Sequence, residues 1–258
     1  MRTLTILIAV MAAVFMLASC GSDAEAPTGF VPDQSVEAYA YVHGGYVGQV
    51  VATTDDEGEF SVTIDEAFLP HTLAIVDIEA DEWNEDNTVF YVQRGNEVRV
   101  AKWISYAGTN YTGVTVGSAL AYVESDEDGN PSGSTILEKS ILRNEESMAS
   151  WWDSIADGAF QVYTEFGGSG SAVTTTSYGS LYKRGSEYWA DRGLTWQGNM
   201  EAIEEAAEEY GIAYALDEMA RNNDNEWELA DATTGATASD FKDYFSLVQL
   251  AVARLEMQ

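Results

Sequence analysis

The spacing of hydrophobic residues changes along the chain from alternation to helical periodicity. In the first half, short runs of alternating apolar and polar residues are separated by turn residues, which is typical of β-strands. Two pairs of runs flank Gly-containing turns, and each pair predicts a β-hairpin: residues 47–53 with 59–64, and residues 89–93 with 97–104. Three further strands are predicted, at residues 37–42, 72–78 and 118–123.

Helical spacing dominates the later part of the chain. It predicts a helix over residues 136–155 and another over 199–210, which Gly211 would end. The clearest helix follows residue 240, where apolar residues recur at intervals of three and four from Phe241 to Leu255. Without an internal repeat or a clear linker, this order predicts a single α+β domain with a twisted, mostly antiparallel sheet and packed helices.

The N-terminus has the features of an export signal. Arg2 precedes an apolar run that is too short to span a bilayer, which needs about twenty residues. Leu17-Ala18-Ser19-Cys20 resembles the bacterial lipobox. The resemblance implies that residues 1–19 are a lipoprotein signal peptide and that Cys20 is acylated. We therefore expect a membrane-anchored lipoprotein outside the cytoplasm, periplasmic or on the cell surface. The alternative is an uncleaved anchor with a free cysteine.

The segment after the cysteine has no apolar periodicity and contains Pro27 and Pro32. Residues 20–35 are therefore predicted to be a flexible tether, and residues 36–258 the folded domain.

Composition narrows the classes of function. The chain of 258 residues carries 43 acidic and 12 basic residues, a net charge of −31. Such an acidic protein is not expected to bind nucleic acid or to dock electrostatically on anionic lipid. One cysteine and two histidines exclude a disulfide scaffold and a cysteine-ligated cluster, and they support neither a metal site nor a Ser/His/Asp triad. No catalytic residue is predicted.

One motif stands directly before the last helix: Asp231-Ala232-Thr233-Thr234-Gly235-Ala236-Thr237. It resembles the D-x-x-[S/T]-G-A-[S/T] flavinylation motif of the FMN-binding domain family. That family includes covalent-FMN subunits of sodium- and proton-pumping oxidoreductases and lipid-anchored extracellular flavoproteins. Residues 44–48, Gly-Gly-Tyr-Val-Gly, resemble the D-G-T-Y-T-G opening of the lipid-anchored members, although His43 stands where Asp often does. Residues 80–195 show no resemblance to this family and are expected to be a subgroup-specific insertion.

The resemblance implies an FMN-binding-domain-like fold and FMN joined to Thr237 by a phosphoester. A separate flavin transferase would attach it, and Asp231, Thr234, Gly235 and Ala236 would complete the cofactor-binding residues. Gly235 and Ala236 leave the backbone accessible, whereas Asp231 would orient the loop or hold a metal ion during transfer. The alternative is a Thr/Ala-rich loop that caps the last helix. Trp227 is a candidate for stacking on the flavin ring.

These features together predict an electron carrier rather than a substrate-converting enzyme, with a membrane oxidoreductase as its electron donor. Two alternatives stay open. One is a lipid-anchored binding or adhesion module without cofactor, which the β-rich first part and the aromatic content would suit. The other is a flavin-dependent reductase that acts directly on a small acceptor.

Overall fold

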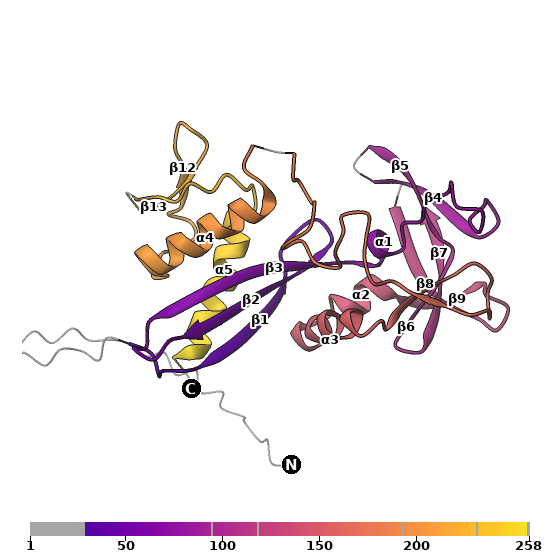
Figure 1. Ribbon diagram of the computed structural model, residues 1–258, viewed down its shortest axis with the longest axis horizontal. Helices are drawn as coiled ribbons and strands as arrows, with labels where there is room; N and C mark the ends of the chain where they lie inside the picture. Colours follow the sequence, from indigo (N-terminus) through magenta and orange to yellow (C-terminus); the bar gives the residue numbers. More distant parts are fainter. Residues whose placement is uncertain (1–28, 94, 118, 192, 231, 257–258) are drawn as a thin grey trace, which may run out of the picture.

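The protein is elongated and has two lobes (Figure 1). The computed structural model describes residues 29–93, 95–117, 119–191, 193–230 and 232–256. The predicted signal peptide, Cys20 and Asp231 lie outside the described residues. We call the lobe that contains both described ends of the chain the terminal lobe, and the lobe built from residues 88–172 the central lobe.

The terminal lobe is a three-stranded antiparallel sheet covered by two helices (Figure 1). The middle strand, β2, is buried along most of its length, and Val47, Val50 and Ala52 are inaccessible. Helix α4 packs mainly on β3, and α5 packs on β1 and β2. The element bounds are β1 Ser35–Tyr41, β2 Tyr46–Thr54, β3 Phe60–Phe68, α4 Trp196–Tyr210 and α5 Phe241–Leu255.

A small antiparallel sheet lies between α4 and α5 in the sequence. It consists of β12 (Ala220–Arg221), β13 (Trp227–Leu229) and β14 (Ala232–Thr233), in that order across the sheet. Because β14 ends just before the loop that leads into α5, this sheet positions the loop that carries the flavinylation-like motif.

The central lobe contains a six-stranded antiparallel sheet, an additional hairpin and two helices. The order of strands in the sheet is β11-β10-β6-β7-β8-β9. Its bounds are β6 Trp103–Tyr106, β7 Thr109–Val116, β8 Ala119–Ser125, β9 Pro131–Ile136, β10 Phe160–Tyr163 and β11 Ser171–Ala172. The hairpin comprises β4 (Thr88–Gln93) and β5 (Asn96–Ala101), and the helices are α2 (Leu137–Ile141) and α3 (Glu145–Ala156).

The two lobes share one buried apolar cluster. At their junction, the returning chain pairs with the end of β3: the Phe68 nitrogen donates to the Leu181 carbonyl and the Lys183 nitrogen to the Glu66 carbonyl. The indole of Trp151 on α3 donates to the Phe68 carbonyl at 3.2 Å. The lobes are therefore joined by main-chain pairing as well as by hydrophobic packing.

The α+β composition and the antiparallel pairing are confirmed, but the described strands are divided among several sheets instead of one. The predicted strand at 72–78 is wrong: Pro70, which suits the first turn of a helix, begins the short helix α1 (Pro70–Leu73). The predicted helix over 136–155 is interrupted, because the Asn144 side chain accepts from the Ser147 nitrogen and starts α3 anew.

Part of the predicted tether is packed. The Phe30 nitrogen donates to the Gly58 carbonyl at 3.1 Å, and the Phe30 ring meets the Phe60 ring edge-on with centroids 5.6 Å apart. The last residues before β1 therefore belong to the folded part. Among the described residues, no helix combines the length and the apolar character that a membrane crossing needs.

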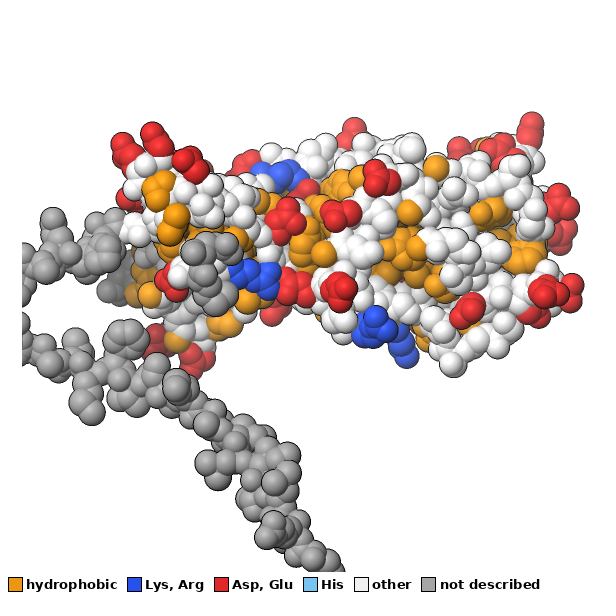
Figure 2. Space-filling view, turned by 90° about the horizontal axis from the view of Figure 1, so that it is seen from below, with side chains coloured by type: hydrophobic (Ala, Val, Ile, Leu, Met, Phe, Trp, Pro, Cys, Tyr) orange, Lys and Arg blue, Asp and Glu red, His pale blue; other side chains and the backbone are white. Residues whose placement is uncertain are grey.

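Acidic side chains are spread over the surface. In Figure 2 they are scattered over both lobes on the face shown, with hydrophobic groups between them and few basic groups. The acidic residues that give the chain its net charge of −31 are thus seen on the surface of both lobes.

Candidate functional site

The motif loop is held by β13. The Thr234 nitrogen and hydroxyl both donate to the Trp227 carbonyl at 2.9 Å, and the Trp227 nitrogen donates to the Ala236 carbonyl at 2.9 Å. The Thr234 hydroxyl also accepts from the Ala236 nitrogen at 3.1 Å. Gly235 closes this turn with φ +76°, and no atom lies within 4 Å of the position where a β-carbon would stand. Thr234 therefore shapes the turn, and Gly235 leaves its outer side open.

Thr237 is fixed by the neighbouring helix. Its nitrogen and its hydroxyl both donate to Asn199 Oδ1, at 2.8 Å and 3.3 Å. Asn199 lies on α4, is only 3% exposed, and donates its amide to the Thr195 carbonyl at 3.0 Å. Thr237 itself stays partly accessible. The structure thus holds one threonine hydroxyl in a defined direction near the surface.

Two basic side chains lie at the same corner. Arg221 Nη2 donates to the carbonyls of Thr237 and Ala238 at 3.2 Å and 3.1 Å. Its guanidinium carbon is 4.8 Å from the centroid of the Trp227 ring, and Lys242 Nζ is 5.5 Å from the same ring. In a chain with only 12 basic residues, this placement gives the motif a local positive charge.

The Trp227 side chain packs between the motif loop and the first turn of α5. The residue is 9% exposed, its ring is stacked on Phe241 with centroids 5.3 Å apart, and its Nε1 donates to the Ala238 carbonyl at 2.6 Å. Its contacts with protein groups leave little ring surface for a flavin, so Trp227 is a structural support of the loop and not an open stacking platform.

The segment 43–48 meets the start of α5 in space. His43 Nε2 lies 3.1 Å from Asp240 Oδ2 at the start of α5, and the His43 ring contacts the edges of Tyr46 and Tyr244. Gly45 has φ +95°, a conformation that favours glycine, and a β-carbon there would stand 2.7 Å from the His71 ring, which would have to shift. His43, directly before the 44–48 segment, therefore contacts the start of α5, which the motif loop leads into.

A buried ion pair lies next to this corner. Lys183 and Glu66 are paired with side chains 1% and 0% exposed, and Lys183 Nζ is 3.3 Å from the centroid of the Tyr46 ring and 4.3 Å from that of Tyr188. The Tyr244 hydroxyl accepts from Trp196 Nε1 at 3.3 Å. Burial, with the Glu66 charge nearby, raises the pKa of Tyr244 far above its usual value, so this tyrosine is neutral at any ordinary pH.

Sequence reasoning singled out Thr234, Gly235, Ala236 and Thr237, which follow one another in the motif loop. The expectation that Ala236 leaves the backbone accessible is wrong, because Ala236 is fully buried and its carbonyl accepts from the Trp227 nitrogen. Sequence reasoning missed Asn199 and Arg221. Asn199 was recognisable only as a polar residue on the otherwise apolar stripe of α4, and Arg221 carried no local signal. The role expected of Asp231 falls outside the described residues.

Within the described part of the chain, no cluster of three or more His, Cys, Asp or Glu side chains is arranged to hold a metal ion. Comparisons of this chain with protein-family models, with curated proteins and with solved structures find no match.

Proposed function

We propose that this protein is an electron carrier with an FMN-binding-domain-like fold, that FMN is attached covalently to Thr237, and that acylated Cys20 tethers it outside the cytoplasmic membrane. The observation that carries the proposal is Thr237 at the end of the flavinylation-like motif, a partly accessible residue whose hydroxyl donates to the buried Asn199. The contact of His43 with Asp240 supports the proposal further, because it links the end of β1 to the start of α5, just after the motif.

The residues at the corner suit a phosphate group joined to Thr237. Arg221 and Lys242 provide positive charge, and the N-terminal end of α5 adds the favourable end of a helix dipole. Acids also lie here: Asp240 contacts His43 and accepts from the Ser239 hydroxyl, and Asp243 stands in the first turn of α5. No atom beyond its chain neighbours lies within 4 Å of a β-carbon position at Gly235, so this side of the loop is uncovered.

Attachment is a transfer from FAD. In the proposed attachment, the Thr237 oxygen would be the nucleophile at the phosphorus on the FMN side of FAD, and AMP would leave as the bond to the bridging oxygen breaks. Nothing is oxidised or reduced in this step. Asn199 accepts a hydrogen bond from the hydroxyl but is a neutral amide, so it orients the oxygen and does not take the proton. The transferase must supply the base.

Bound FMN supplies one- or two-electron redox chemistry, and the chain supplies its attachment, surroundings and access. A membrane oxidoreductase is the proposed electron donor. With a donor and an acceptor both outside the chain, the protein acts as a relay.

Flavinylation is tested by co-expressing the chain with a flavin transferase and measuring intact mass and visible absorbance. The expected product is yellow and heavier by one FMN less one water. Thr237→Ala abolishes this gain. The matched control Thr233→Ala alters an exposed threonine of the same motif and retains it.

The outcomes separate the alternatives. A colourless wild-type protein after co-expression would favour a binding module without cofactor, and covalent flavin on Thr237→Ala would falsify the attachment site. Reduction of a small acceptor by the isolated flavoprotein with an artificial electron donor would favour a reductase.

The anchor is tested separately. Cys20→Ala is expected to move the protein from the membrane fraction to the soluble fraction without changing the flavinylation of Thr237. If the variant still co-sediments with membranes and keeps its full-length N-terminus, the lipoprotein assignment fails and the uncleaved-anchor alternative gains support.

A further inference from the structure

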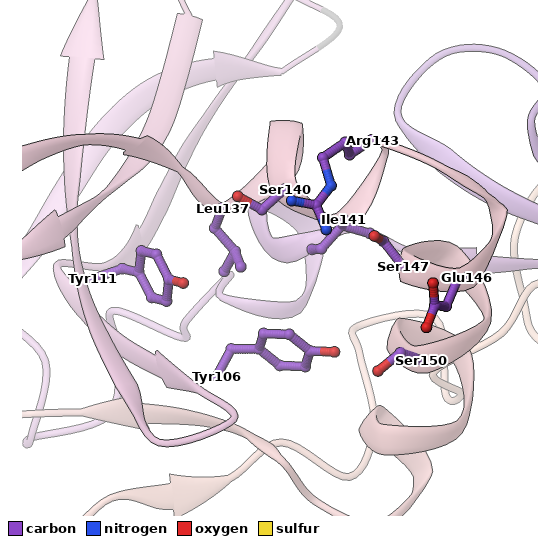
Figure 3. A pocket seen from close by; sticks show the side chains of 9 residues that line it. All are labelled: Tyr106, Tyr111, Leu137, Ser140, Ile141, Arg143, Glu146, Ser147 and Ser150. Atoms are coloured by element: carbon purple, nitrogen blue, oxygen red, sulfur yellow. The ribbon is translucent and has the colours of Figure 1, made fainter.

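The central lobe has a pocket of about 320 Å³ between its sheet and its two helices (Figure 3). Tyr106 and Tyr111 form the sheet side, and Leu137 and Ile141 of α2 form the helix side. The helical segment is interrupted between α2 and α3. The residues around this interruption line the pocket together with residues of strands β6 and β7. None of the residues of the motif loop lines it.

Two opposite charges stand at one side of this pocket. Figure 3 shows the Arg143 guanidinium and the Glu146 carboxylate on the same side, with the Ser147 hydroxyl between them. They are not within ion-pair distance of each other. Among the arginines that the structure describes, four have polar partners: Arg99, Arg184, Arg221 and Arg254. For Arg143, and likewise for the Glu146 carboxylate, no such partner is found within the described residues.

The opposite wall is aromatic and apolar. The Tyr106 hydroxyl shares a hydrogen bond with Ser154 at 3.0 Å, so its ring and not its hydroxyl is offered to the pocket. Tyr111 is 6% exposed, and burial raises its pKa, so its hydroxyl stays neutral. A ligand here would meet charged groups at one end and rings and aliphatic side chains at the other.

The charge of the whole molecule limits which ligands are acceptable. At a net charge of −31, the surrounding field disfavours anions. The exposed Arg143 guanidinium and the exposed Glu146 carboxylate line the same side of the pocket, and neither has a protein partner in the described structure. Together they match a ligand that carries both charges. The volume is at the lower end of the roughly 300–1,000 Å³ typical of small-molecule sites, which suits a single small molecule.

We propose that this pocket binds a free α-amino acid with an aromatic or large apolar side chain. Arg143 would hold the α-carboxylate, Glu146 would hold the α-ammonium, and the side chain would lie against the partly exposed ring of Tyr106, over the buried Leu137 and Ile141. The hydroxyls of Ser140 and Ser147 also line the charged side. The inference stands independently of the flavin, because the pocket belongs to the other lobe.

The test is isothermal titration of the purified protein with L-phenylalanine. Three partial ligands dissect the recognition: phenethylamine lacks the carboxylate, 3-phenylpropionate lacks the amine, and glycine lacks the side chain. We expect saturable one-to-one binding of L-phenylalanine, with each partial ligand at least about tenfold weaker, because charge-assisted hydrogen bonds and apolar burial each contribute that much.

Variants of the two charged residues complete the test. Arg143→Gln and Glu146→Gln should each weaken L-phenylalanine binding at least about tenfold. Lys139→Gln, which removes an exposed cation of α2 outside the pocket, should leave it unchanged, as should Thr237→Ala.

Three results would overturn the proposal: no saturable binding of L-phenylalanine, equal binding of 3-phenylpropionate and L-phenylalanine, or equal affinities for Arg143→Gln and Lys139→Gln. Thermal melts of the exposed-site variants establish that each is folded, so that a loss of binding reports on the site.

Discussion

The two lobes handle buried charge differently. In the terminal lobe, the buried acid Glu66 is paired with Lys183, and the largely buried Glu204 is paired with Arg184. In the central lobe, the Glu138 carboxylate oxygens are buried with no side-chain partner among the described residues, and burial raises the pKa of Glu138 to about 7. The terminal lobe thus pairs two of its buried acids with bases, although burial also raises the pKa of its Asp65 to about 6, whereas Glu138 of the central lobe has no basic partner among the described residues.

The largest expected effect follows from breaking the terminal-lobe pair. Lys183→Met leaves the Glu66 charge buried without its partner, and we expect a loss of about 3–5 kcal/mol in the free energy of unfolding by urea titration. In the double variant Lys183→Met/Glu66→Leu, most of this loss should be recovered because no charge remains to be buried.

The matched control is Lys139→Met, which removes an exposed lysine of the central lobe and should change stability by less than about 0.5 kcal/mol. If Lys183→Met proves as mild as this control, the buried pair does not stabilise the terminal lobe.

The next effect concerns pH. Because the pKa of Glu138 is raised by burial to about 7 from 4.5, the folded state holds this proton more tightly than the unfolded state does. Its contribution to stability is full below pH 4.5 and is lost as the pH rises towards 7. Glu138→Gln should therefore stabilise the protein at pH 8 by up to about 3 kcal/mol and reduce the fall in stability between these pH values.

Melting temperatures measured from pH 4 to 8 test this, with the exposed Glu127→Gln as control. Burial also raises the pKa of Asp65 in the terminal lobe, to about 6. The Glu138→Gln variant should therefore still lose some stability as the pH rises towards 6, but less than the wild type loses up to pH 7. Identical pH profiles for wild type and Glu138→Gln would contradict the assignment.

The smallest expected effects compare one helix cap in each lobe. Asn144 accepts from the Ser147 nitrogen at the start of α3, and Thr195 accepts from the Gly198 nitrogen at the start of α4. Replacement of either residue by Ala should cost about 1 kcal/mol. Thr195→Ala should in addition slow the flavinylation of Thr237, since α4 carries Asn199; Asn144→Ala should not. Equal transferase rates in the two variants would argue that α4 does not position the site.

Local patterns predicted much of the fold, and contacts between distant residues account for most of what they missed. Helix α5 and the β4–β5 hairpin were recognisable because their spacing and turn residues are neighbours in sequence. The Thr237–Asn199 contact joins residues 38 positions apart, and Lys183–Glu66 joins residues 117 apart. Nothing in a single sequence pairs them.

The motif loop shows the same division. Thr237 was predicted from a run of seven residues, but the direction of its hydroxyl depends on α4 and its positive surroundings on Arg221. The apolar spacing alone favours one continuous helix over α2 and α3. The Asn144 side chain instead accepts from the Ser147 nitrogen and starts a new helix there. The pocket beside this break could not be foreseen, because a pocket arises from the angle between elements.

The covering of the first sheet by the last helices has a consequence for synthesis. Strands β1–β3 are complete at Phe68, but their partners α4 and α5 end only at Tyr210 and Leu255. At roughly 5–20 residues per second, the apolar face of this sheet waits on the order of ten seconds or more after its own translation, while the whole central lobe is made first. A nascent chain of this protein therefore exposes β2 for that period, and a chaperone that binds extended apolar segments is expected to engage it there.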